Sequence, residues 1–111
     1  MVQPDPRLFA ALADSTRLAL IDELARQSPQ PTTALARDAG ASRQAVTKHL
    51  AVLAEAGLVR DERRGRERLW SLQAAPLRDV RDWADRFRRH WSARLDRLER
   101  FLADHPEGDE P

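Results

Sequence analysis

The chain has 111 residues and no cysteine, and its 19 basic and 18 acidic side chains leave a formal net charge of +1. This length predicts a single domain, and the absence of cysteine excludes disulfides, thiolate metal sites and cysteine nucleophiles. No apolar run approaches the roughly 20 residues that span a bilayer, and the first residues lack the pattern of a signal peptide. We therefore expect a cytoplasmic protein without membrane contact.

The positive charge is concentrated in the middle of the chain. Residues 35–70 hold eight basic and five acidic side chains, a net charge of +3, whereas residues 1–34 and 71–111 each carry a net charge of −1. Where the charge lies matters more for nucleic-acid binding than its total. The near-neutral composition is therefore compatible with a basic surface formed by the middle segment.

Two helices are predicted at the start of the chain. Asp5 is expected to cap the first helix, with Pro6 in its first turn. Its apolar face would consist of Leu8, Phe9 and Leu12. A second helix is expected to start after Asp14 or Ser15 and to end near Gln27, before a segment with two prolines. Its apolar positions, spaced by three and four residues, are Leu18, Ile21, Leu24 and Ala25.

Two further short helices follow with helix-turn-helix spacing. Thr32 is expected to cap a helix over 33–39, which Gly40 would end in a left-handed conformation. Ser42 is expected to cap the next helix, over 43–56, which ends before Gly57. A turn of about three residues that contains glycine is typical of the helix-turn-helix motif.

A basic β-hairpin is predicted directly after this motif, over residues 58–72. Residues 58–63 and 67–72 have strand composition, and Arg64-Gly65-Arg66 between them has turn chemistry. Four arginines gather near its tip: Arg63, Arg64, Arg66 and Arg68. The hairpin would form the wing of a winged helix-turn-helix, a mainly α fold of about five helices with a two-stranded wing.

The last predicted helix, over 76–102, carries one long apolar stripe. The stripe consists of Leu77, Val80, Ala84, Phe87, Trp91, Leu95, Leu98 and Leu102. A small monomeric core cannot cover a stripe of this length, so we expect a homodimer. The domain would span 1–103, and the acidic segment 104–111 is expected to be a disordered tail.

The outward face of the 43–56 helix has the chemistry of a DNA major-groove reader. Arg43, Gln44, Thr47 and Lys48 fall together on this face, which has no acidic residue. Arginine and lysine suit guanine, and glutamine suits adenine. The arginines of the wing would reach flanking phosphates or the minor groove. The alternative for each feature is an ordinary solvated surface.

The segments "LADSTRLALIDEL" (12–24) and "SRQAVTKHLAVLAEAGLVRDERRGRERLWSL" (42–72) resemble the ArsR/SmtB winged-helix repressors of bacteria. The resemblance implies a homodimer that pairs through its first and last helices. Its interface would include Leu8 and the stripe positions 77 to 98. The implied DNA contacts of the recognition helix are Ser42, Arg43, Gln44, Thr47, Lys48 and His49. The implied partner is a palindromic double-stranded operator, and the implied action is repression.

The metal ligands of the family's classical sensors are missing from this chain. Residues 31–37 contain no cysteine or histidine, so we expect no metal and no cofactor. A small-molecule effector would be compatible with the sequence. One alternative is an atypical metal site of His90 with carboxylates such as Asp82 or Asp85. Another is a protein-interaction module on the same fold. An enzyme is not expected, because the three histidines are scattered and no nucleophile or phosphate loop accompanies them.

Overall fold

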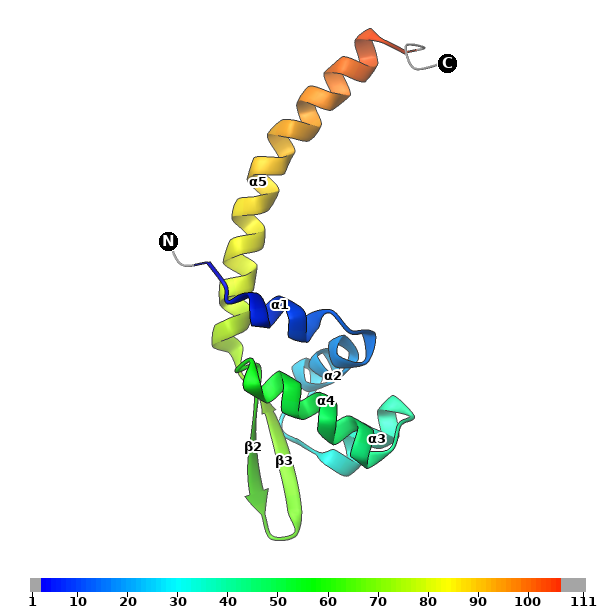
Figure 1. Ribbon diagram of the computed structural model, residues 1–111, viewed down its shortest axis with the longest axis vertical. Helices are drawn as coiled ribbons and strands as arrows, with labels where there is room; N and C mark the ends of the chain where they lie inside the picture. The colour runs from blue at the N-terminus through cyan, green and yellow to red at the C-terminus, as the bar shows by residue number, and fades with distance from the viewer. Residues whose placement is uncertain (1–2, 107–111) are drawn as a thin grey trace. The chain divides into compact units, whose positions relative to one another are not determined.

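The computed structural model describes residues 3–106 and shows five helices and three strands among them (Figure 1). The elements are α1 (Pro6–Leu12), α2 (Ser15–Arg26), β1 (Gln30–Pro31), α3 (Thr32–Ala39), α4 (Arg43–Glu55), β2 (Val59–Arg64), β3 (Glu67–Leu72) and α5 (Ala74–Asp104). Contacts divide the chain into two compact units, residues 1–79 and 80–111. The first unit holds the predicted helix-turn-helix and wing, so the predicted fold class is confirmed.

The first two helices begin at the predicted caps. The Asp5 carboxylate accepts a hydrogen bond from the Arg7 amide (2.9 Å), and that of Asp14 accepts one from the Arg17 amide (3.0 Å). The predicted stripe of α2 is partly wrong, since Leu18 and Ala25 are exposed. The inward face instead follows positions 17, 20, 21 and 24. An arginine at its first position hides this pattern, because the half-buried Arg17 donates from Nε to the Ala11 carbonyl (2.6 Å).

The core of the first unit lies between α2, α3, α4 and the base of the wing. Its most deeply buried side chains are Leu20, Leu24, Leu35, Val46, Leu50, Leu53, Leu58 and Trp70. Leu8, which was expected at a dimer interface, belongs to the same core and is only 5% exposed. Leu8 therefore packs within its own unit, and its contribution to a dimer interface stays a prediction.

The turn between α3 and α4 has the predicted chemistry. Gly40 ends α3 with a φ of 65°, and the Ser42 hydroxyl accepts a hydrogen bond from the Ala45 amide (3.1 Å). The predicted cap at Thr32 is wrong, because Pro31 occupies the cap position and Thr32 is the first helical residue. The Thr32 hydroxyl instead accepts a hydrogen bond from Trp70 Nε1 (2.8 Å).

The sheet has one strand more than predicted. The strand order is β1-β3-β2, and β1 contributes two residues, with Gln30 opposite Trp70 and Pro31 opposite Leu69. A two-residue strand beside prolines has no alternating pattern from which it could be predicted. The Gln30 side-chain amide is buried and donates to the Gln27 carbonyl (2.8 Å), which closes the end of α2.

The hairpin register places the wing's side chains on two defined faces. Arg64 pairs with Glu67, so the turn has two residues, and its first, Gly65, has a φ of 59°. This positive φ is what a type II′ turn requires. Side chains that lie opposite each other share a face. Arg63 and Arg68 therefore lie on the same face as Trp70, whereas Arg64 lies on the other.

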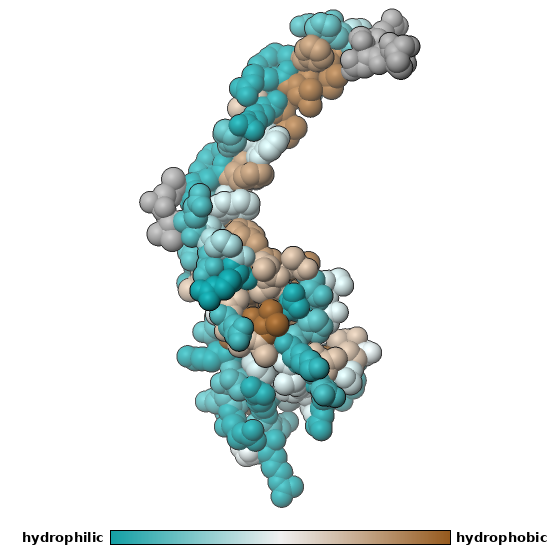
Figure 2. Space-filling view, in the orientation of Figure 1, coloured by the Kyte–Doolittle hydropathy of each residue, from teal (hydrophilic) through white to brown (hydrophobic). Residues whose placement is uncertain are grey.

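The second unit is the α5 helix from residue 80 onward, and its apolar side chains are exposed. Phe87, Trp91, Leu95 and Leu98 are between 39% and 56% exposed. Figure 2 shows the apolar surface running along one side of this helix beside a hydrophilic side. The predicted tail starts later than expected, because Asp104 is helical and the His105 ring stacks on Phe101 at 4.2 Å. Residues 107–111 of the predicted tail lie outside the described residues.

None of the helices within residues 3–106 has an apolar stretch long enough to cross a membrane.

Candidate nucleic-acid interface

A groove of about 370 Å³ in the first unit is bordered by the first turns of α3 and α4 and by the tip of the wing. The residues that line it are Pro31, Thr32, Thr33, Arg43, Gln44, Thr47, Arg63, Arg66, Glu67 and Arg68. The groove thus brings together two segments that are separate in the sequence, the outward face of the recognition helix and the basic hairpin.

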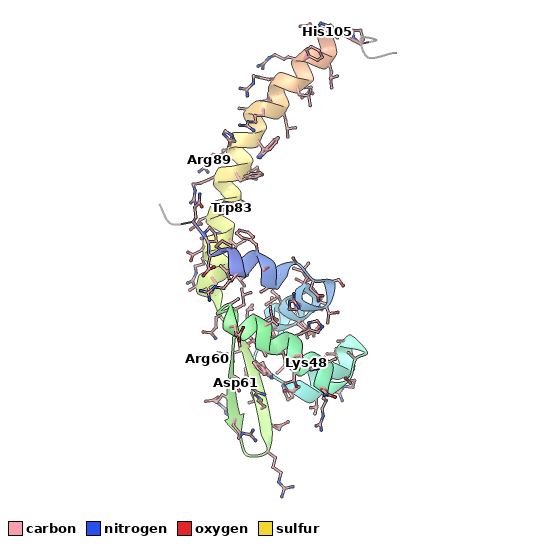
Figure 3. All side chains as sticks on the ribbon, in the orientation of Figure 1. Lys48, Arg60, Asp61, Trp83, Arg89 and His105 are labelled. Carbon is pink, nitrogen blue, oxygen red and sulfur yellow. The ribbon has the colours of Figure 1, made fainter. Side chains whose placement is uncertain are left out.

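The recognition helix α4 supplies three side chains to the groove. Arg43 and Gln44 are exposed in its first turn, directly after the Ser42 cap, and Thr47 lies one turn further along. The groove therefore receives the end of the helix where backbone N–H groups lack intrahelical acceptors. Lys48 is exposed one turn beyond Gln44 and is not part of the groove's lining (Figure 3).

The wing supplies three of its four predicted arginines. Arg63 and Arg68 lie directly opposite each other on the groove face, and Arg66 lies in the turn. Arg64 does not line the groove; on the other face its Nε lies 3.5 Å from Glu62 Oε1. The sequence could not assign these faces, because they depend on the length of the turn.

The groove retains unpaired positive charge. Arg68 donates from Nε to Asp61 Oδ2 (2.7 Å), and its guanidinium lies 4.6 Å from the centre of the Trp70 ring. This hydrogen bond lowers the pKa of Asp61 below its ordinary value. Within residues 3–106, Arg43, Arg63 and Arg66 form no ion pair. Arginine side chains in this state are suited to bind phosphate oxygens.

Four residues of the groove were not predicted from the sequence: Pro31, Thr32, Thr33 and Glu67. Thr32 and Thr33 reach it because β1 pairs with β3 and brings the start of α3 beside the wing. Glu67 follows the turn and adds one negative charge to the lining. Their arrangement depends on strand pairing between distant segments, for which the sequence carries no local signal.

His49 lies apart from the other predicted contacts of the recognition helix. Its Nδ1 lies 3.2 Å from the Arg17 guanidinium and 3.8 Å from Asp14 Oδ2. Arg17 in turn donates to the Ala11 carbonyl, which joins α1, α2 and α4 at one point. The backbone amide of Arg17 donates a hydrogen bond to the Asp14 carboxylate and so holds the pKa of Asp14 below its ordinary value. The structure thus gives His49 an interhelical contact and does not place it in the groove.

These features define a winged helix-turn-helix protein whose recognition helix and wing share a basic groove. A helix-turn-helix domain family matches residues 12–62. The HTH-type transcriptional regulator Rv2034 of Mycobacterium tuberculosis is 44% identical over 84 residues, which cover 76% of this chain and 77% of that protein. An ArsR-like transcriptional regulator from Rhodococcus sp. RHA1 is 34% identical, with a TM-score of 0.68 over 86% of this chain and 90% of that one.

A third similar protein is the homodimeric winged helix-turn-helix DNA-binding domain of Mb0332 from Mycobacterium bovis. It is 25% identical, with a TM-score of 0.58, and the match covers 96% of this chain and 83% of that chain. The chain belongs to the ArsR family of winged helix-turn-helix transcriptional regulators.

Proposed function

We propose that the protein is a homodimeric repressor that binds a palindromic double-stranded DNA operator through the groove between α4 and the wing. The observation that carries this proposal is the shared groove itself. It places Arg43 and Gln44, which suit base edges, beside Arg63 and Arg66, which suit phosphates. Two copies related by a two-fold axis would insert their α4 helices into successive major grooves, about one helical turn apart.

Dimerisation is proposed to occur through the α5 stripe of Leu77, Val80, Ala84, Phe87, Trp91, Leu95 and Leu98. Leu77 and Val80 are half-buried and the other five are exposed, and a covered dimer interface is the usual reason for such a stripe on a regulator of this size. That the similar domain from M. bovis is homodimeric supports dimerisation. Trp83, Phe87 and Trp91 form a row of rings with centroid separations of 5.1 and 5.6 Å, which we assign to this interface.

The regulation is proposed not to require a metal ion. The chain has no cysteine. Within residues 3–106, the histidine and acidic side chains of one chain form no cluster of three. A small-molecule effector or simple autorepression fits these observations better than metal sensing does. Addition of Zn²⁺, arsenite or EDTA should leave operator affinity unchanged within twofold; a larger change would overturn this part of the proposal.

The direct test uses the duplex that the wild-type protein selects from a randomised library, together with a scrambled duplex of equal length. Arg43→Ala should weaken binding to the selected duplex about tenfold or more, the discrimination that one bidentate base contact supplies. Its binding to the scrambled duplex should change little. Arg66→Ala should weaken binding to both duplexes and flatten the salt dependence. Unchanged affinity in both variants would exclude the groove as the DNA-binding surface.

A further inference from the structure

We propose that Asp61 determines how strongly this regulator discriminates between its preferred site and other DNA. Its carboxylate would cancel one positive charge beside the groove and hold Arg68 in a fixed position. The first effect would weaken binding to arbitrary DNA, and the second would preserve binding to the preferred site. This inference rests on the proposed DNA-binding function of the groove.

Asp61 and Arg68 form an exposed ion pair, with 42% and 43% of their side chains accessible, that also contacts a buried ring. Asp61 lies opposite Trp70 in the ladder, on the groove face of the wing (Figure 3). Its Oδ2 accepts from Arg68 Nε at 2.7 Å, and the Trp70 ring lies against the same guanidinium. Trp70 is 1% exposed and is fixed by Thr32. Arg68 is therefore held between an anchored ring and a carboxylate.

The held guanidinium keeps donors for DNA. An arginine has five N–H donors, and the contact to Asp61 uses the one on Nε. The terminal nitrogens of Arg68 remain able to bind a phosphate that lies in the correct position. A side chain that is already ordered loses less conformational entropy on binding than a mobile one. The Asp61 contact should therefore preserve the correctly placed contact.

The negative charge of Asp61, in contrast, weakens binding to arbitrary DNA. Binding to arbitrary DNA depends almost entirely on the number of phosphates that basic side chains neutralise. A carboxylate beside Arg68 removes about one unit from that number. Arg63, directly opposite Arg68, has no ion pair among residues 3–106, so the two facing guanidinium groups retain one carboxylate between them. The Asp61 carboxylate thus weakens the attraction of the groove for DNA phosphates in general, while the terminal N–H donors of Arg68 remain available.

The adjacent residue provides a matched control. Glu62 is the next residue of the same strand, but it lies on the opposite face and is paired with Arg64, which does not line the groove. Asp61→Asn and Glu62→Gln each remove one negative charge and change no other atom beyond the carboxyl group. Any difference between the two variants then reports position and not net charge.

The experiment measures binding of the full-length wild type, Asp61→Asn and Glu62→Gln by fluorescence anisotropy at several salt concentrations, on the selected and scrambled duplexes. For Asp61→Asn, the slope of log affinity against log salt on scrambled DNA should steepen by up to ~0.9, which makes the gain about threefold larger at 50 mM than at 200 mM salt. The ratio of selected to scrambled affinity should fall several-fold. Glu62→Gln should change the slope by less than half as much. Adding Arg68→Gln to Asp61→Asn should abolish the gain.

Two results would overturn the inference. Equal effects of Asp61→Asn and Glu62→Gln would mean that net charge alone matters. Weaker or unchanged binding of Asp61→Asn to scrambled DNA would mean that the carboxylate only supports the wing. Thermal unfolding of each variant shows whether the fold is intact, and Asp61→Glu, which keeps the charge, should restore discrimination if the contact is the cause.

Failure of the proposed function is distinguishable from failure of this inference. Arg43→Ala tests the groove without touching Asp61. If Arg43→Ala loses selected-site binding while Asp61→Asn behaves as wild type, only the inference fails. If Arg43→Ala and Arg66→Ala retain full affinity, the groove is not the DNA-binding surface, and the inference fails together with the proposed function.

Discussion

The indole Nε1 of Trp70 donates a 2.8 Å hydrogen bond to the hydroxyl of Thr32. Trp70 belongs to the wing and Thr32 to the first turn of α3, so this bond joins the two sides of the groove. Because the ring is buried, the indole N–H has no ready access to water in place of Thr32. The contact therefore connects the wing to the start of α3 at the groove.

Thr32→Val should lower the free energy of unfolding by about 1–3 kcal/mol, the cost of leaving a buried donor without an acceptor. Trp70→Phe also removes part of a buried ring, so a double-mutant cycle with Thr32→Val isolates the contribution of the N–H bond. Urea unfolding checks both. Thr33→Val, at the exposed neighbouring position, is the control and should change stability by less than about 0.5 kcal/mol.

Arg63→Ala should reduce the slope of log affinity against log salt by about 0.9, the contribution of one phosphate contact. Arg64→Ala removes the same charge from the same strand, but on the face where Glu62 is its partner, and should reduce the slope much less. Binding titrations between 50 and 200 mM salt compare the two. Equal slopes would show that DNA does not distinguish the faces of the wing.

Leu95→Glu should dissociate the proposed dimer, because it places a charge within the exposed apolar stripe of α5. Ala93→Glu adds the same side chain on the polar side of the helix and should leave the mass unchanged. Sedimentation equilibrium measures both. A dimer that survives Leu95→Glu with wild-type affinity would place the interface elsewhere.

His49→Ala should leave DNA affinity within about twofold of wild type while it lowers stability, since His49 contacts Arg17 and Asp14 and does not line the groove. Anisotropy titration and urea unfolding on the same preparation separate the two effects. A tenfold loss of affinity with unchanged stability would show that His49 contacts DNA, as the sequence suggests.

The protein should lose stability in acid below about pH 4. Folding lowers the pKa values of Asp5, Asp14 and Asp61 from their ordinary value of 3.8, through hydrogen bonds to arginine side chains or amides. Their stabilising effect is therefore complete above this value and declines as the pH falls through the lower folded values. Urea unfolding between pH 2.5 and 7 measures the decline. In Asp61→Asn, the loss of stability with falling pH should be less steep than in the wild type. A steeper loss would contradict the lowered pKa of Asp61.

The sequence predicted the features that depend on neighbouring residues. Ser42 and Gly40 lie where a cap and a left-handed turn belong, and both signals involve the adjacent backbone only. Thr32 had the same cap signal, but its hydroxyl bonds to Trp70, a partner that appears only after the sheet forms. Leu8 carried an apolar signal that suits an interface and a core equally well.

The candidate site was predictable in composition and not in arrangement. Arginines near the wing tip stand out in the sequence, yet the pairing of Arg63 with Arg68 on one face follows from strand register. His49 lies in a family motif, but its direction depends on where α2 places Arg17. The two-residue strand β1, which brings Thr32 to the groove, depends on pairing with a strand that lies far along the chain.

The two-residue turn at Gly65 decides which charges the groove presents. With Arg64 opposite Glu67, the face of the wing that carries Trp70 also carries Arg63 and Arg68, whereas Glu62 and Arg64 lie on the other face. Glu67, directly after the turn, still lines the groove. Shifting one strand by a single residue would exchange the faces of all its side chains. With the same composition, Glu62 and Arg64 would then lie on the groove face. Evolution of this wing could thus alter its attraction for DNA by inserting or deleting one residue at the turn, without replacing any charged side chain.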